Sequence, residues 1–181
     1  MTVTYRDAMP ADAHLLPDLF RTSFTDTFGH LYAAQDLAAF LADFTEEAWR
    51  AELQQPDLKL RLAEEEGQAI GFAKISDPTL PADLRGPTIE LRQFYILTPW
   101  QGRGVAAELM AWAIAVGRSR GAEDMILSVY IDNHRAKRFY ARYGFEVIGD
   151  YAFMVGNHAD EDLIMRASLA SLVMRDLIRH P

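Results

Sequence analysis

The sequence predicts a mixed α/β protein built around one sheet. Segments in which apolar residues alternate are interspersed with segments in which they recur every three or four residues, and turns rich in glycine or proline separate them. The expected order of elements, βαα-ββ-βαβ-αββ, contains neither a repeat nor an interdomain linker. A chain of 181 residues, 50% of them hydrophobic, is long enough to bury a substantial core. We therefore expect residues 1–181 to form a single domain.

The first third of the chain is expected to hold one strand followed by helices. Residues 2–6 alternate as a strand does, and Pro10 is typical of the first turn of the helix that follows. The segment 28–32 interrupts that helix. Shorter helices are expected over residues 36–44 and 46–53, the second with Thr45 as its N-cap.

The remaining chain is expected to alternate between strands and helices. The acidic turn 64–68 indicates a hairpin, because Gly67 tolerates a positive φ, and the three prolines of residues 77–87 indicate a loop. Strands are expected over 58–63, 69–75, 89–97, 125–131, 145–148 and 163–167, and helices over 106–120, 133–143 and 169–180.

Composition excludes several classes of function. The net charge of -8 disfavours sequence-independent binding of nucleic acid, which depends on Lys and Arg. The chain has no Cys and its five His are scattered, so we expect no metal site and no cysteine nucleophile. No leader-like segment and no long apolar run is present, so we expect a cytoplasmic protein that does not associate with a membrane.

The most informative segment is the turn Gln101-Gly102-Arg103-Gly104-Val105-Ala106, placed between an apolar strand and a helix. Such a turn presents unpaired backbone N–H groups and the positive end of a helix dipole, which favours a phosphate or pyrophosphate. The glycines also fit a dinucleotide fingerprint, with Glu123 at the place of a ribose-binding acid. However, fewer than about 80 residues follow the turn, which is too few for a doubly wound sheet.

A second block accompanies this turn. Gln101, Gly104 and Ala106 fill a pattern of Gln or Arg, two spacers, Gly, one spacer, then Gly or Ala, and the block Asn133-x-x-Ala136-x-x-Phe139-Tyr140-x-x-x-Gly144-Phe145 follows. Together the two blocks resemble the coenzyme A site of the GNAT (Gcn5-related) N-acetyltransferases. The resemblance implies a mixed, mostly antiparallel sheet of about seven strands, flanked by helices and splayed between the fourth and fifth strands.

The resemblance also implies a cosubstrate, acetyl-CoA, and a set of roles. Tyr140 matches the acid that protonates the leaving thiolate, and Glu90 matches the base that several members use to deprotonate the amine, a role that water can fill instead. A structural ion pair of Glu90 with Arg92 is the competing interpretation. The implied cofactor-binding residues are Phe94, Tyr95, Ile96, Gln101, Gly102, Arg103, Gly104, Val105, Ala106, Asn133 and Tyr140.

Within the family, residues 24–28 and 162–169 look like those of PaiA-type polyamine acetyltransferases. This resemblance implies a small cationic, polyamine-like acceptor, direct transfer in a ternary complex, and acceptor contacts at His30, Tyr32 and Tyr151. Amino acids, peptide N-termini and an antibiotic amine remain open as acceptors, and a homodimer is possible. Two other hypotheses also stay open: a module that binds acetyl-CoA without turnover, and a nicotinamide-dependent enzyme.

Overall fold

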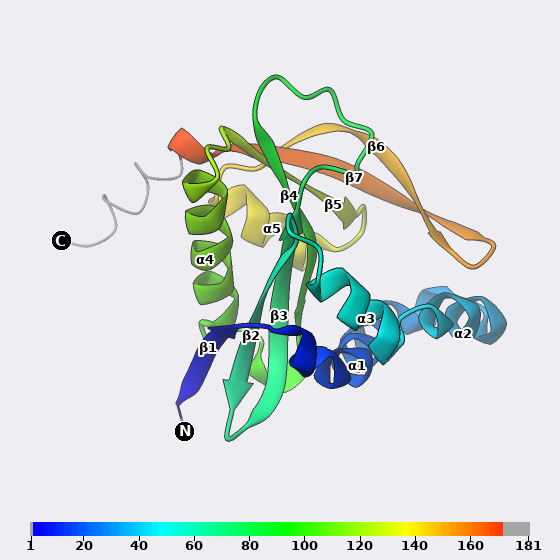
Figure 1. Ribbon diagram of the computed structural model, residues 1–181. Helices are drawn as coiled ribbons and strands as arrows, with labels where there is room; N and C mark the ends of the chain where they lie inside the picture. The colour runs from blue at the N-terminus through cyan, green and yellow to red at the C-terminus, as the bar shows by residue number, and fades with distance from the viewer. Residues whose placement is uncertain (1, 172–181) are drawn as a thin grey trace. The chain divides into compact units, whose positions relative to one another are not determined.

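The computed structural model describes residues 2–171, which form two compact units (Figure 1). The first unit comprises residues 2–75, 93–113 and 154–158, and the second comprises residues 76–92, 114–153 and 159–171. Residues 169–171 are helical, and the rest of the helix expected over 169–180 lies outside the described residues. No helix in the described range is long and apolar enough to cross a bilayer.

The first unit begins with a strand and a series of helices. Thr45 is the N-cap of the helix that begins at Glu46, as expected, since its hydroxyl accepts from the Ala48 N–H at 3.1 Å. The elements are β1 (Val3–Asp7), η1 (Pro10–Leu15), α1 (Leu16–Phe28), η2 (Gly29–Leu31), α2 (Ala34–Ala42), α3 (Glu46–Leu53), β2 (Lys59–Glu65) and β3 (Gln68–Ser76). Strand β2 pairs antiparallel with β1 on one side and with β3 on the other.

The core of the first unit is an aromatic cluster. Phe20 of α1 lies at its centre, with ring centroids 4.3 Å from Phe44, 6.0 Å from Trp49 and 5.1 Å from Tyr95. Tyr95 also contacts Phe72 of β3, with a centroid separation of 5.8 Å. Tilted and edge-on rings at these separations bury a large apolar area in favourable geometry. The cluster therefore fixes the helices against the strand that leads into the glycine turn.

The second half of the chain supplies β4 (Thr88–Ile96), η3 (Thr98–Trp100), α4 (Val105–Ser119), β5 (Asp124–Tyr130), α5 (His134–Arg142), β6 (Glu146–Val155) and β7 (His158–Ser168). In the second unit, β5 is covered on both faces, and Met125, Ile126 and Leu127 are all almost completely buried. Its neighbour β7 runs antiparallel to it from Asp124↔Ser168 to Tyr130↔Asp162.

The strands hydrogen-bond in the order β1-β2-β3-β4-β5-β7-β6. The sheet is mixed and mostly antiparallel, as the family resemblance implied, and β4 and β5 are parallel. The parallel register covers three pairs, from Thr88↔Asp124 to Glu90↔Ile126, while β4 continues to Ile96. A register that ends this early agrees with the expected divergence of the two strands.

Strands β6 and β7 are much longer than the sequence indicated. Residues 145–148 and 163–167 were expected to be strands, whereas the structure has strands of 10 and 11 residues joined at Gly156 and Asn157. Strand β6 is at the edge of the sheet, and most of its residues are exposed or half-buried. An edge strand with little burial has a weak alternation, so its length depends on pairing with its neighbour rather than on its own pattern.

Candidate functional site

The glycine turn belongs to the first unit and joins β4 to α4 through the short helix η3. Gly102 and Gly104 have φ angles of 77° and 88°, in the left-handed region that favours glycine. The buried side chain of Val105 begins α4 and anchors the end of the turn. The first N–H groups of a helix have no partner within it, so the turn and the start of α4 offer backbone donors to an anion.

Two side-chain hydrogen bonds hold this turn in place. The amide Nε2 of Gln101 donates to the carbonyl oxygen of Ile96 at 2.8 Å, which ties the turn to the end of β4. The indole Nε1 of Trp100 donates to Glu65 Oε2 at 2.7 Å, which ties η3 to the end of β2. Sequence reasoning did not predict this contact of Glu65 with Trp100, because nothing in the pattern links two residues 35 positions apart.

The other expected cofactor residues of the first unit lie around this turn. Phe94, Tyr95 and Ile96 form the end of β4 and are half-buried, and the side chain of Arg103 is exposed. Strand β3 approaches β4 closely here, since a Cβ on Gly71 would lie 2.9 Å from the Tyr95 carbonyl oxygen. The structure therefore brings Phe94–Ile96 and residues 101–106 together in one unit.

Asn133 and Tyr140 belong to the second unit and share helix α5. Asn133 is the N-cap of this helix, and its Oδ1 accepts from the Ala136 N–H at 3.1 Å. Tyr140 lies in the same helix with its ring 5.6 Å from Phe139 and 5.7 Å from Phe145. Burial raises the pKa of the Tyr140 hydroxyl well above its ordinary value, because the phenolate would lose its hydration. The hydroxyl is thus a proton donor over the whole physiological range.

Glu90 is buried in β4 and anchors the loop that precedes this strand. Its Oε2 accepts from the backbone N–H groups of Thr79 and Leu80 at 2.5 Å and 3.0 Å, and both carboxylate oxygens lie within hydrogen-bond distance of the Thr79 hydroxyl. Arg92 Nε is 4.0 Å from Glu90 Oε1, so the expected ion pair is present but long. The carboxylate is therefore shared between several donors of its own chain.

The residues expected at the acceptor are distributed over both units. In the first unit Tyr32 stacks on Phe24 with an interplanar angle of 10° and contacts His158 edge-on at 5.5 Å, whereas His30 is exposed. Tyr151 is a half-buried residue of β6 in the second unit. The structure thus places Tyr32 in contact with the first residue of β7.

Several carboxylates that could attract a cationic acceptor already have partners. Glu64 pairs with Arg6 at 2.8 Å, Asp36 Oδ1 accepts from the Asn157 N–H at 3.0 Å, and Glu65 and Glu90 are engaged as described above. Asp26 and Glu66 are exposed. Formal charge alone therefore does not define an acceptor site.

A carboxylate that sequence reasoning missed lies opposite Tyr130 in the second unit. Asp162 of β7 is 7% exposed and is paired in register with Tyr130 of β5. Burial raises its pKa to about 6, the nearby charge of Asp160 acts in the same direction, and a hydrogen bond with the Ser128 side chain opposes them. No group of three or more His, Cys, Asp or Glu within residues 2–171 is arranged to hold a metal ion.

Comparison with known proteins decides the family. The model of the acetyltransferase (GNAT) family matches residues 18–145. The chain belongs to the GNAT family. It is accordingly an acetyl-CoA-dependent N-acetyltransferase, and the family match covers both the glycine turn and the block that contains Asn133 and Tyr140.

Two sequence relatives and one solved structure show what this acetyltransferase is similar to. An uncharacterized N-acetyltransferase of Mycobacterium tuberculosis is 31% identical over 136 residues, which cover 74% of this chain and 82% of the relative. The aminoalkylphosphonate N-acetyltransferase of Salmonella typhimurium is 30% identical over 102 residues, which cover 55% of this chain and 64% of the relative. The crystal structure of PaiA N-acetyltransferase from Thermoplasma acidophilum in complex with coenzyme A superposes with a TM-score of 0.75 at 18% identity, covering 93% of this chain and 99% of that chain.

Proposed function

We propose that this acetyltransferase moves the acetyl group of acetyl-CoA directly to a primary amine of a small cationic, polyamine-like acceptor in a ternary complex. The observation that supports a coenzyme A site is the glycine turn before α4, held by Gln101 and Trp100 with its backbone donors at a helix start. The chain contains no Cys to carry an acetyl group, which favours direct transfer. In this reaction the amine nitrogen bonds to the thioester carbonyl carbon and loses a proton to Glu90 or to water, the C–S bond breaks, and the thiolate receives a proton.

The cofactor roles follow from the donors that each segment carries. The N–H groups of residues 102–106 bind the diphosphate, and the exposed Arg103 adds a charged donor. The backbone of Phe94, Tyr95 and Ile96 pairs with the amide groups of the pantetheine arm as an added strand would. The Asn133 side chain uses its Oδ1 to cap α5, which leaves its amide N–H groups for the cofactor.

Tyr140 is the acid that protonates the thiolate. A phenol has an ordinary pKa of about 10 and a thiol one of about 8.5, so transfer of the proton to the thiolate is uphill unless it accompanies C–S cleavage. Burial raises the pKa of Tyr140 further, which ensures that the hydroxyl is protonated when the thiolate forms. Removal of the hydroxyl is therefore expected to slow the chemical step rather than cofactor binding.

Glu90 is either the base that deprotonates the amine or the anchor of the preceding loop. Its contacts with Thr79 and Leu80 support the second role, since these donors occupy the lone pairs that a base needs. Glu90→Gln separates the two roles. As an anchor, the Gln carbonyl oxygen still accepts from both N–H groups and kcat stays within about threefold of wild type. As a base, kcat falls on the order of 10²-fold or more across the pH range.

The proposed class of acceptor is based on the similarity of this chain to acetyltransferases with named acceptors or motifs. The likeness to PaiA in sequence motifs and fold, and the net charge of -8, support a polyamine-like cation. The likeness to an aminoalkylphosphonate N-acetyltransferase supports a second candidate, an amine that also carries an anionic group. Amino acids, peptide N-termini and antibiotic amines belong in the same screen.

Thiol release with acetyl-CoA and a panel of these amines tests the proposal. Acceptor-dependent release of free CoA with a diamine or polyamine, and formation of the acetylated amine by mass spectrometry, is the expected result. Release with an amino acid or an aminoalkylphosphonate instead would move the acceptor to the second candidate. Calorimetric binding of acetyl-CoA without release for any amine would support a sensor module that has lost catalysis and would refute the proposed enzyme.

A further inference from the structure

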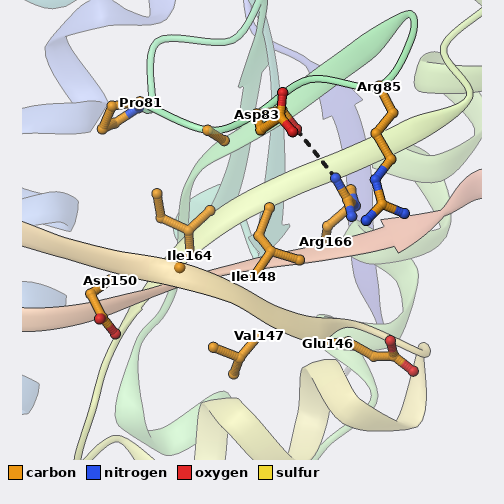
Figure 2. A pocket seen from close by; sticks show the side chains of 11 residues that line it. Pro81, Asp83, Arg85, Glu146, Val147, Ile148, Asp150, Ile164 and Arg166 are labelled. Carbon is orange, nitrogen blue, oxygen red and sulfur yellow. Dashed lines mark hydrogen bonds between the residues drawn. The ribbon is translucent and has the colours of Figure 1, made fainter.

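A polar groove on the second unit contains none of the residues assigned to acetyl transfer. It has a volume of about 430 Å³ and lies between the loop 81–85, residues 146–150 of β6, and the β7 residues Ile164 and Arg166 (Figure 2). Its volume lies within the range of about 300–1,000 Å³ typical of sites for small molecules. All lining residues belong to one unit, so the groove is complete within it.

The lining carries charges of both signs that do not neutralise one another. Three carboxylates, Asp83, Glu146 and Asp150, and two guanidinium groups, Arg85 and Arg166, line the groove. Within the part of the chain that the structure describes, none of these carboxylates forms an ion pair with either guanidinium. Charges of opposite sign that line one groove without pairing with each other suit a ligand that carries both signs.

The two guanidinium groups and Asp150 lie toward opposite ends of the groove. Figure 2 shows the Arg85 and Arg166 side chains next to each other on one side, with Asp83 beside Arg166 and Glu146 on the same side, Asp150 at the other end, and Ile148 and Ile164 between them. The five residues of β6 in the lining span about 13 Å at a rise of about 3.3 Å per residue. The groove therefore offers two adjacent guanidinium groups toward one end, two Ile side chains in the middle and the Asp150 carboxylate at the other end, over the length of a short aliphatic chain.

Arg166 is held in position before any ligand arrives. Its side chain is 12% exposed, its Nη1 donates to the backbone oxygen of Asp83 at 3.3 Å, and its Nε lies 4.0 Å from Asp124 Oδ2. These contacts leave Nη2 of the Arg166 guanidinium group available to an acidic group of a ligand. Because the side chain is already held in place, it loses little conformational entropy when a ligand binds. The exposed Arg85 supplies a second cation beside it.

We propose that this groove binds a small linear zwitterion. Arg85 and Arg166 hold its carboxylate or phosphonate, Ile148 and Ile164 contact its methylene chain, and Asp150 receives its ammonium group. A diamine of the same length would place one ammonium against two guanidinium groups, and a simple carboxylic acid would leave Asp150 without a partner. The proposal does not depend on acetyl transfer.

Isothermal titration calorimetry on the full chain, saturated with CoA so that the cofactor site is filled, tests the proposal. The probes are 6-aminohexanoate, hexanoate and 1,6-diaminohexane, which share a chain length and differ in their end groups. We expect 6-aminohexanoate to bind at least about tenfold more tightly than either of the others. Arg85→Ala and Asp150→Asn should each raise its Kd by about fivefold or more. Arg138→Ala, which removes an exposed cation of α5 outside the groove, should leave the Kd unchanged.

Equal affinity for the three probes, or equal Kd values for the Arg85→Ala and Arg138→Ala variants, would overturn the proposal. Arg85 and Asp150 are both exposed, so their substitution is not expected to unfold the chain, and unaltered circular dichroism verifies this. Turnover of an amine without zwitterion binding would refute this inference alone. Zwitterion binding without turnover of any amine would refute the proposed function alone.

Discussion

The Glu65 carboxylate accepts a hydrogen bond of 2.7 Å from the Trp100 indole, and this bond joins the end of β2 to the helical turn that leads into Gln101. Glu65 is 8% exposed, and its second oxygen, Oε1, has no hydrogen-bond partner among the described residues. A buried carboxylate with a single donor depends strongly on that donor.

Trp100→Phe should therefore be costly for both stability and cofactor binding. The substitution leaves the Glu65 carboxylate without the indole donor, and we expect a loss of about 1–3 kcal/mol in the free energy of unfolding. Because η3 carries the glycine turn, the Kd for acetyl-CoA should also rise. Urea unfolding and calorimetry measure the two effects.

Trp112→Phe is the matched control, since Trp112 is half-buried and forms no hydrogen bond through its indole with any described residue. Equal unfolding free energies for the two variants would show that the contact between Glu65 and Trp100 contributes nothing.

Tyr140→Phe should lower kcat about 10²-fold or more and leave the affinity for acetyl-CoA almost unchanged. Tyr143→Phe removes a hydroxyl one turn along and should be close to wild type. Because burial raises the pKa of Tyr140 above its ordinary value of 10.0, its ionisation should cause no loss of kcat below pH 10. A wild-type kcat for Tyr140→Phe, measured where chemistry limits the rate, would remove Tyr140 from the role of acid.

Asp162→Asn should increase stability more at pH 7.5 than at pH 5.0. Burial raises the pKa of Asp162 from 3.8 to about 6, so the folded state binds this proton more tightly than the unfolded state does. The free energy of unfolding therefore falls as pH rises through the window from about 4 to about 6, and an Asn cannot contribute to that fall. The nearby groups are Ser128, Asp160 and Tyr130, which the substitution leaves in place.

Melting temperatures at the two pH values measure this effect. Glu161→Gln is the control, because Glu161 is the exposed neighbour of Asp162 on β7. An equal gain for Asp162→Asn at both pH values would contradict the raised pKa.

Gly156→Ala should destabilise the contact between the hairpin turn and α2. Gly156 has a φ of +58°, and a Cβ there would lie 2.6 Å from Asp36 Oδ1 and 2.8 Å from Asp36 Cα. The same Asp36 oxygen accepts from the Asn157 N–H at 3.0 Å, so relief of the clash would break this hydrogen bond.

Gly67→Ala provides the comparison, because Gly67 has a φ of +79° and a Cβ added there would have no neighbour within 4 Å. Both variants bear the cost of about 1–2 kcal/mol for a left-handed conformation, and only Gly156→Ala bears the clash. We expect the greater loss in chemical unfolding for Gly156→Ala. Equal losses would show that the turn moves away from Asp36 without cost.

Most helix boundaries and turns could be predicted because they depend on short stretches of sequence. The start of α3 at Thr45, the break at residues 28–32 and the glycine turn at 101–104 each depend on the conformational preferences of a few neighbouring residues. Strand β6 was underestimated because its residues lie at an edge, where burial imposes no clear alternation.

The residues of the candidate site also fall into two groups, those that local motifs suggested and those whose role depends on distant partners. Gln101, Asn133 and Tyr140 were assigned through the resemblance of two local motifs to a known family, and their roles stay predictions. The structural roles of Glu65, Asp162 and the groove residues Arg85 and Arg166 were not predicted, because each role depends on a partner far away in sequence.

The sequence by itself determined the family, the order of elements and the glycine turn that the family uses for its cofactor, because these depend on short-range geometry and on motifs of fixed spacing. Only the tertiary structure decided that Glu90 accepts hydrogen bonds from the preceding loop, that Asp162 is buried, and that charges of both signs line one groove. Burial and charge pairing depend on which strands lie side by side, and a linear pattern does not contain that information.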